Sequence, residues 1–178
     1  MIRTFKNIVL LLSTLFFSLN LNAKIFDEVR AGILYHDVRS THSYEDGQDI
    51  NAEMLFAQFN NEIMNIIFDP RVHLGASVNT KGYTSQYYSG LTWHFYFDDA
   101  VFMVLSFGGE IHSGNINCQN RKKRAYGSRF LFRESASIGY DINQNHNISI
   151  MIDHSSNTGM GKYNPGLTNL GLRYGHKF

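Results

Sequence analysis

The clearest pattern in the sequence is QYYSGLTWHFYFDDAVFMVLSFGGEIH, residues 86–112. In residues 86–97 most apolar and aromatic side chains fall on alternate positions, and residues 101–111 repeat this alternation, although Phe102 and Val104 put apolar side chains on the other face as well. Such a period of two is typical of a β-strand with one apolar face, and Asp98-Asp99 between the two runs favours a tight turn. The stretch therefore predicts a β-hairpin. Its apolar positions are Tyr87, Leu91, Trp93, Phe95, Phe97, Val101, Met103, Leu105, Phe107 and Ile111.

The same alternation recurs along the chain and predicts eight strands. Long connections at 39–48, 113–126 and 157–166 alternate with short ones at 98–99 and 141–145, as in outer-membrane barrels. Two connections fit less well, since 60–69 should be short and 81–84 should be long. Residues 62–68 are read as a short helical turn or a continued strand, and Lys81-Gly82 as a turn. The expected strands cover 28–38, 50–58, 71–80, 86–97, 101–112, 130–140, 147–156 and 168–178.

The N-terminus has the features of a cleaved secretory signal peptide, residues 1–23, followed by a single domain over 24–178. Arg3 and Lys6 supply positive charge, residues 8–17 are mostly apolar, and Leu21-Asn22-Ala23 is a suitable cleavage site. An uncleaved anchor is the alternative, although the apolar run is short for a spanning helix. No later segment approaches the ~20 apolar residues of a membrane helix.

A chain without a spanning helix can cross a membrane only as a closed barrel, because every backbone polar group must be paired in lipid. Aromatic residues make up 14% of the chain, which suits the girdles of such a barrel. We therefore predict an all-β fold, an eight-stranded antiparallel transmembrane β-barrel of the outer-membrane type. A soluble periplasmic β-barrel that binds an apolar ligand is a weaker alternative.

Charge and cysteine content exclude several classes of function. The net charge is +1, with 16 basic and 15 acidic residues, so no nucleic-acid surface is expected. The run Arg121-Lys122-Lys123-Arg124 is read as a solvated loop or as a contact for anionic lipid headgroups. Cys118 is the only cysteine, so it has no internal disulfide partner, and no Cys/His spacing suggests a metal or cofactor.

The inward positions of the predicted barrel carry several polar and charged side chains. Eight strands leave no open channel, which counts against a porin, and these side chains are expected to fill the interior as a hydrogen-bonded network. We expect the scattered histidines to form hydrogen bonds rather than bind a metal. The network residues are Glu53, Glu110, Arg129 and Arg173, and the histidines are His36, His94 and His112.

The last two strands hold the densest cluster of reactive side chains. His154 and Ser156 continue the alternation of Ile148, Ile150 and Ile152, so a His and a Ser share one apolar face. Their Cα atoms are roughly 7 Å apart on a strand, and converging rotamers could join the hydroxyl to the imidazole. A Ser activated by a His is a common nucleophile, whereas the alternative reading is two interfacial polar residues where a strand leaves the bilayer. The next connection offers N–H donors for an oxyanion at Asn157, Gly159 and Asn164.

His154, Ser156 and Asn157, with Asn164-Pro165-Gly166, resemble the active-site motif of the PagL family, the outer-membrane lipid A 3-O-deacylases. Stretches 32–38, 73–80 and 127–135 are also similar to the family, so the resemblance covers nearly the whole mature chain. It implies an esterase in the outer membrane of a Gram-negative bacterium, acting on lipid A of lipopolysaccharide without a cofactor. Ser156 would be the nucleophile and His154 the base. A homodimer is a further expectation.

The resemblance has one departure, because the acidic member of the family's triad falls on Thr168. A Thr hydroxyl can orient a ring nitrogen but supplies no charge. Asp153 is next to His154 but on the opposite face. If Tyr140 pairs with His146, Phe132 lies opposite His154, and Glu134 is diagonally adjacent on the lipid-facing side.

We therefore form the hypothesis that Glu134 replaces the missing acid. The alternative is an interfacial Glu paired with Arg133 or Arg129. For the whole protein, the alternative to an enzyme is a catalytically decayed barrel that serves a structural or surface-interaction role through its long loops.

Overall fold

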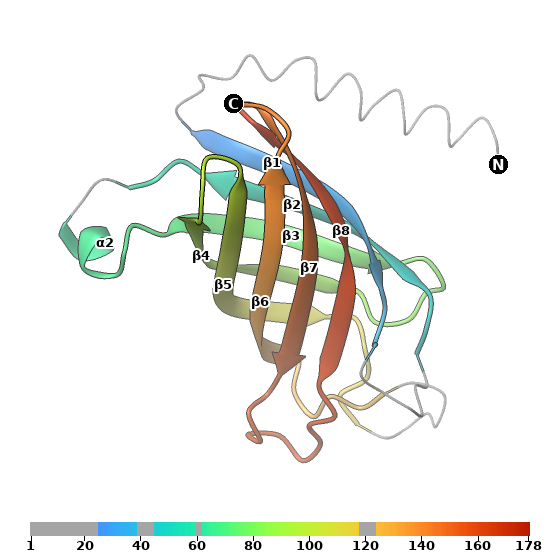
Figure 1. Cartoon of the computed structure of the whole chain (residues 1–178). Helices are drawn as coiled ribbons and strands as arrows, with labels where there is room; N and C mark the ends of the chain where they lie inside the picture. Colours follow the sequence, from blue (N-terminus) through green and yellow to red (C-terminus); the bar gives the residue numbers. More distant parts are fainter. Residues whose placement is uncertain (1–24, 39–44, 60–61, 118–123) are drawn as a thin grey trace.

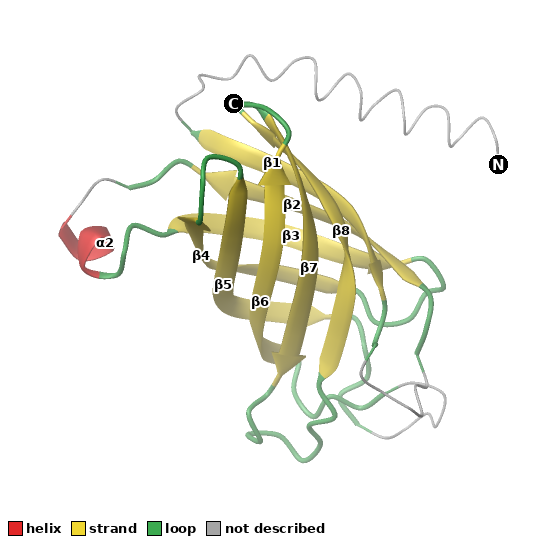
Figure 2. Ribbon diagram, in the orientation of Figure 1, coloured by secondary structure: helices red, strands yellow, loops and turns green. Residues whose placement is uncertain are grey.

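The computed structural model describes residues 25–38, 45–59, 62–117 and 124–178. Within them, eight antiparallel strands follow one another around a closed barrel, and the first strand pairs with the last (Figures 1 and 2). This confirms the predicted fold, and closure leaves no free sheet edge. The strands are β1 (Phe26–Tyr35), β2 (Gln48–Phe56), β3 (Arg71–Asn79), β4 (Gln86–Tyr96), β5 (Val101–His112), β6 (Phe130–Asp141), β7 (His146–Ser156) and β8 (Leu167–Lys177).

The barrel is apolar outside and polar inside. Along β7, for example, Ile148, Ile150 and Ile152 are 45–59% exposed, whereas Met151 and Asp153 are buried. A folded chain in water has the opposite arrangement, so the outer wall is suited to lipid. The filled, charged interior also argues against a soluble barrel with an apolar ligand inside.

Ion pairs between strands fill the interior. Arg30 on β1 binds Glu28 at 2.8 Å and Glu53 of β2 at 3.3 Å, while Arg173 of β8 reaches the same Glu53 carboxylate at 3.0 Å. All four side chains are buried. A buried charge is costly unless it is paired, so this network joins the first two strands to the last. The predicted roles of Glu53 and Arg173 are confirmed.

Of the other two predicted network residues, Glu110 lies inside the barrel and Arg129 does not. Glu110 is buried and accepts hydrogen bonds from Ser155 (2.8 Å) and Gln86 (2.8 Å). The prediction for Arg129 is wrong, because its side chain is exposed and its Nη1 donates to the carbonyl of Gly114 at 3.0 Å. Strand β6 begins one residue later, so Arg129 lies outside the alternation that places a side chain inside the barrel.

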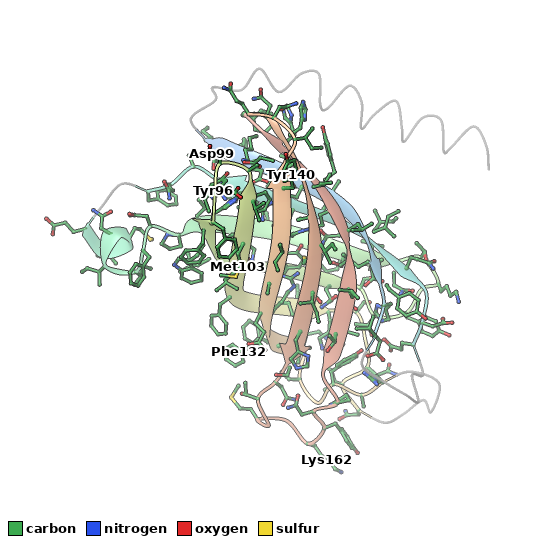
Figure 3. All side chains as sticks on the ribbon, viewed as in Figure 1. Tyr96, Asp99, Met103, Phe132, Tyr140 and Lys162 are labelled. Carbon is green, nitrogen blue, oxygen red and sulfur yellow. The ribbon has the colours of Figure 1, made fainter. Side chains whose placement is uncertain are left out.

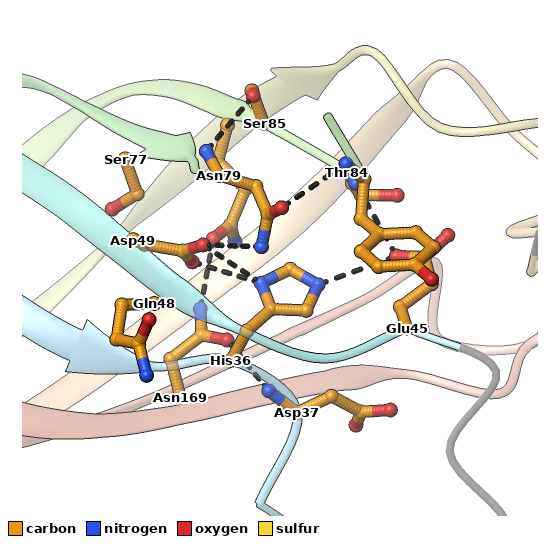
Figure 4. Close-up of polar contacts among 12 residues, drawn as sticks. His36, Asp37, Glu45, Gln48, Asp49, Ser77, Asn79, Thr84, Ser85 and Asn169 are labelled. Atoms are coloured by element: carbon orange, nitrogen blue, oxygen red, sulfur yellow. Dashed lines mark hydrogen bonds and ion pairs between the residues drawn. The ribbon is translucent and has the colours of Figure 1, made fainter. Parts of the chain in front are cut away.

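The three histidines form hydrogen bonds, as predicted. His36 Nδ1 lies 2.9 Å from the carboxylate of Asp49, and its Nε2 lies 3.3 Å from Glu45 (Figure 4). Arg71 donates to His94 Nδ1 at 2.9 Å, and His112 Nε2 donates to the Ser128 carbonyl at 2.7 Å. Among the described residues, no three His, Cys, Asp or Glu side chains are grouped so that they could hold a metal ion.

The two ends of the barrel differ. The C-terminus and the short turns after β4 and β6 lie at one end, and the connection between β7 and β8 lies at the other (Figure 1). Tyr96, Asp99 and Tyr140 mark the first end, and Lys162 marks the loop end (Figure 3). Outer-membrane barrels have short periplasmic turns and longer extracellular loops, which predicts that the loop end faces the cell exterior.

The predicted turn at Lys81-Gly82 is confirmed, and of the two alternatives for residues 62–68 the structure has the helical turn. Helix α2 (Glu62–Ile66) forms the short helical turn between β2 and β3, and Gly82 has a φ of 77° in the turn after β3. No helix in the described ranges is long and apolar enough to cross a membrane. The predicted signal peptide, Cys118 and the basic residues 121–123 lie outside the described residues.

Candidate active site

His154 stands at the centre of a row of side chains on the outer wall. The strand register places it directly opposite Glu134 of β6 and Thr168 of β8. Ser156, on the same face, is opposite Phe132 and is the last residue of β7. The structure therefore brings the predicted His, Ser and Thr together at the loop end of the lipid-facing wall.

The imidazole of His154 is fixed on two sides. Its Nδ1 lies within hydrogen-bond distance of Thr168 Oγ1, at 2.8 Å. Behind the ring, Gly166 has a φ of 68°, and a Cβ on it would lie 2.6 Å from Cε1 and 3.2 Å from Nε2 of His154. Only glycine suits both this backbone conformation and this contact. If Nδ1–H donates to Thr168, Nε2 keeps the lone pair that a general base needs.

Ser156 faces a hollow on the outer surface. This hollow has a volume of about 460 Å³, and Glu134, His154, Thr158 and Met160 also line it. The Ser156 hydroxyl makes no hydrogen bond within the described part of the chain. In an enzyme without its substrate, the hydrogen bond between nucleophile and base is often long or absent and forms on binding.

The position of Glu134 corrects the predicted register. Tyr140 pairs with Ile148 rather than His146, so Glu134 lies directly opposite His154 instead of diagonally. Its side chain is exposed on the outer wall, and neither predicted arginine pairs with it. Arg133 turns into the barrel to bind Asp153 at 2.7 Å. Among the described residues, the Glu134 carboxylate has no ion-pair or hydrogen-bond partner.

Asp153 is buried inside the barrel, as predicted from its parity. It accepts hydrogen bonds from Arg133 and from Asn169 Nδ2, at 2.7 and 3.0 Å. Its carboxylate is therefore paired on the side of the wall opposite to the imidazole. This excludes Asp153 as the missing acid.

The three candidate oxyanion residues have different surroundings. The Asn157 side chain is buried and donates to the carbonyls of Tyr126 and Tyr163 at 2.7 and 2.6 Å. The Gly159 N–H donates to Asn157 Oδ1 (2.9 Å), and the Asn157 N–H donates to Asn164 Oδ1 (3.0 Å). Asn157 and Gly159 therefore hold the loop in shape. The amide nitrogen of Asn164 has no partner in the described residues and is the donor left for a ligand.

A larger apolar groove adjoins the His154 row. It has a volume of about 660 Å³ and is formed by two adjacent cross-strand rows on the outer wall. The first row contributes Phe107, Glu134, His154 and Thr168, and the second contributes Trp93, Leu105, Ala136 and Ile152. The groove thus leads from the imidazole over apolar side chains toward β4. Sequence reasoning missed it, although the register of the hairpins contains it.

Arg124, predicted to lie in a solvated loop or against lipid headgroups, instead supports the site, with a side chain that is only 13% exposed. Its Nη1 donates to the Gly166 carbonyl at 2.9 Å and to Asp37 at 3.0 Å. The N–H of Val38 donates to the Thr168 carbonyl at 2.8 Å. Three connections that are far apart in the sequence are thereby joined behind the imidazole, and no local sequence signal indicates this.

Comparisons with known proteins agree with the barrel fold. The family model described as "Lipid A 3-O-deacylase (PagL)" matches residues 57–177, more than half of the chain. The crystal structure of the outer membrane enzyme PagL is similar, with a TM-score of 0.62 and 14% identity, covering 85% of this chain and 99% of that chain.

A de novo designed transmembrane β-barrel has a TM-score of 0.53 and 11% identity, and covers 86% of this chain and 95% of the design. At these identities the likenesses establish the fold alone. No curated protein matches the sequence significantly. The family match, which spans the strands that carry the row of His154, shows that the chain belongs to the PagL family of lipid A 3-O-deacylases.

Proposed function

We propose that this protein is an outer-membrane esterase that removes the 3-O-linked acyl chain from lipid A of lipopolysaccharide. The observation that carries the proposal is the position of His154 and Ser156, which share the lipid-facing wall at its loop end beside an apolar groove. In a Gram-negative outer membrane this is the level of the outer leaflet, where lipid A resides. Residues 1–23 would act as the export signal.

The arrangement supports a two-step acyl transfer. Ser156 Oγ attacks the ester carbonyl while His154 Nε2 takes its proton, which gives a tetrahedral oxyanion. The Asn164 amide is the nearby free donor for that oxyanion. Collapse breaks the bond to the 3-oxygen of the sugar, and the imidazolium returns the proton to it. Water, activated by the same imidazole, then hydrolyses the acyl-serine and releases a fatty acid.

The lipid-facing location removes a large desolvation cost. The acyl chain can lie in the groove lined by Leu105, Ala136 and Ile152 without leaving the hydrocarbon phase. The polar reacting groups remain at the loop end of the groove, next to the headgroup region. Neither a metal nor an organic cofactor takes part in this scheme.

Two residues share the task of the missing acid. Thr168 fixes the orientation of the ring through Nδ1, at 2.8 Å. Glu134, opposite His154 on the other neighbouring strand, supplies the negative charge that stabilises the imidazolium. An unpaired carboxylate on a lipid-facing wall is costly, which favours a functional reason for its presence.

A second candidate function is a decayed barrel that acts through its loops. Thr168 at the acid position favours it, because a neutral partner leaves the imidazolium without a hydrogen-bonded carboxylate.

The experiment that distinguishes the esterase from the decayed barrel is mass spectrometry of lipid A from a Gram-negative host that expresses the protein, with Ser156→Ala as the matched control. Loss of one 3-linked acyl chain only with the intact serine supports the esterase. Unchanged lipid A with a folded barrel in the outer membrane would refute it.

A further inference from the structure

Helix α2 and the residues after it, 62–69, form a segment that we call the α2 segment. It projects sideways from the barrel wall near the end with the short turns (Figures 1 and 2). Three of its five apolar side chains point away from the protein, since Ile63, Ile66 and Phe68 are 72%, 77% and 80% exposed. These are the three highest exposures among the large apolar side chains in the described ranges.

The α2 segment is held firmly in this position. Trp93 Nε1–H on β4 donates to the Ile67 carbonyl at 2.7 Å, and Gln58 Nε2 donates to the Asp69 carbonyl at 2.7 Å. The Asp69 N–H donates to the Met64 carbonyl at 2.8 Å. Two consecutive non-glycine residues, Phe68 and Asp69, have φ values of 65° and 50°. Such a strained conformation persists only where its surroundings impose it. The fold therefore fixes the Phe68 side chain in its exposed position.

The α2 segment lies at the level of the lipid-facing wall and not beyond the short-turn end of the barrel. β3 begins at Arg71, which pairs with Thr92, so β4 continues beyond β3 from Trp93 to Tyr96. The α2 segment contacts β4 at Trp93. Beyond Trp93, toward the short-turn end, the outer wall continues through two more outward-facing rows. They are Phe95, Met103, Ile138, Ile150 and Leu172, then Tyr140, Ile148 and Tyr174.

We propose that the α2 segment is embedded in the periplasmic leaflet of the membrane, with Ile63, Ile66 and Phe68 among the phospholipid acyl chains. It meets the lipid-facing wall at Trp93, which pairs with Leu105 of β5 in an outward-facing row. The carbonyl that meets the wall is already paired with Trp93, as lipid requires. Residues 57–69 contain Glu62 and Asp69 but no Lys or Arg, so attachment rests on apolar burial and not on attraction to anionic headgroups.

The test uses the mature barrel folded in phosphatidylcholine vesicles with bromine on the acyl chains. Cys118→Ser removes the single native cysteine, and Ile66→Cys then carries an environment-sensitive fluorophore. Met160→Cys is the matched control, because Met160 is similarly exposed, at 71%, but lies in the connection between β7 and β8 at the other end. We expect quenching by bromine at position 66 to exceed that at position 160 at least about threefold and to be unchanged at ~1 M salt.

A second variant separates embedding from folding. Trp93→Phe removes the hydrogen bond to Ile67 and should lower bromine quenching at position 66, while the heat-modifiable mobility of the barrel on gels is retained. Equal quenching at positions 66 and 160, or quenching at 66 mainly by aqueous iodide, would overturn the proposal. Shielding from both quenchers, together with disulfide cross-linking between two unlabelled Ile66→Cys copies, would also overturn it and show a dimer contact instead.

Discussion

His154 Nδ1 lies 2.8 Å from Thr168 Oγ1, across the β7–β8 ladder, so the hydrogen-bond partner of the imidazole is a neutral hydroxyl and not a carboxylate. The hydroxyl can accept a hydrogen bond from Nδ1–H, or donate one to an unprotonated Nδ1. The first arrangement leaves Nε2 as a base, whereas the second makes Nε2 a donor and prevents it from accepting the proton of Ser156. In the proposed mechanism, activity therefore depends on which of the two arrangements is populated.

Restoring a carboxylate at this position should raise activity. For Thr168→Glu we expect kcat for lipid A deacylation to increase about 10- to 100-fold, because a carboxylate selects the Nδ1–H form and stabilises the imidazolium. Rates can be followed by mass spectrometry of purified protein with lipid A in detergent. Thr168→Val, which removes the hydroxyl, should lower kcat below that of the native protein. A Thr168→Glu variant no faster than the native chain would contradict this account of the site.

Neutralising Glu134 should lower kcat while KM changes little. We expect a loss of about 10- to 100-fold for Glu134→Gln, since the amide keeps the shape but removes the charge opposite His154. The sharper comparison is the same substitution in the Thr168→Glu background. There it should cost much less, because two carboxylates that serve one imidazolium are not additive. Equal losses in both backgrounds would show that Glu134 has a different role.

Adding a methyl group at Gly166 should disturb the imidazole. Its Cβ would lie 2.6 Å from His154 Cε1, so we expect Gly166→Ala to lower kcat about 100-fold through displacement of the ring. The matched control is Gly82→Ala, because Gly82 also has a positive φ, 77°, but nothing lies within 4 Å of its added Cβ. Both substitutions should cost ~1 kcal/mol of stability from backbone strain. Similar activity in the two variants would remove the positioning role of Gly166.

Removing one partner of an interior ion pair should destabilise the barrel. Arg173→Met leaves Glu53 with only the longer contact to Arg30, 3.3 Å, and we expect a loss of about 3–5 kcal/mol in urea unfolding from vesicles. The control is Lys81→Gln, whose pair with Asp46 at 2.8 Å is half exposed and should contribute at most ~1 kcal/mol. Equal losses would mean that the interior pairs contribute no more than surface pairs.

The pair of carboxylates around His36 predicts a pH dependence at the loop end. Burial alone would lower the pKa of His36, but hydrogen bonds to Asp49 and Glu45 outweigh it and raise the pKa to about 9. A raised folded-state pKa means that the stabilisation is complete below the unfolded value near pH 6.5 and is lost as the pH rises through 9. Melting temperatures between these limits should therefore fall with pH in the native chain. His36→Asn should flatten that slope, and a parallel curve would contradict the assignment.

The alternation of apolar and polar residues was sufficient to predict the strands and their faces. Each strand has one side in lipid and one in a charged interior, so the pattern of period two is strong, and it correctly placed His154 and Ser156 outside and Asp153 inside. The pairing register of the strands could not be predicted in this way. Turn geometry sets the register, and the alternation fits equally well after a shift of two residues. A shift of two residues keeps every side chain on its face, which is why Glu134 was expected in the right place on the wall but not opposite His154.

Contacts between loops could not be predicted at all. The contact of Gly166 with His154 and the bridge from Arg124 to Gly166 and Asp37 join connections that only barrel closure brings together. Nothing in the residues around each of these positions indicates its partner. The same holds for Arg129, whose exposed position follows from the point at which β6 begins.

The interior ion pairs also restrict how the barrel can be assembled. Glu28 on β1 accepts a hydrogen bond from Asn147 on β7, and Glu53 on β2 is shared between Arg30 and Arg173 of β8. A partly inserted chain that lacked its last two strands would hold these carboxylates in the membrane without Asn147 of β7 and Arg173 of β8. Insertion and charge neutralisation must therefore be completed together, so we expect an all-or-none transition in which the first strands remain at the bilayer surface until the last strand is available to close the ring.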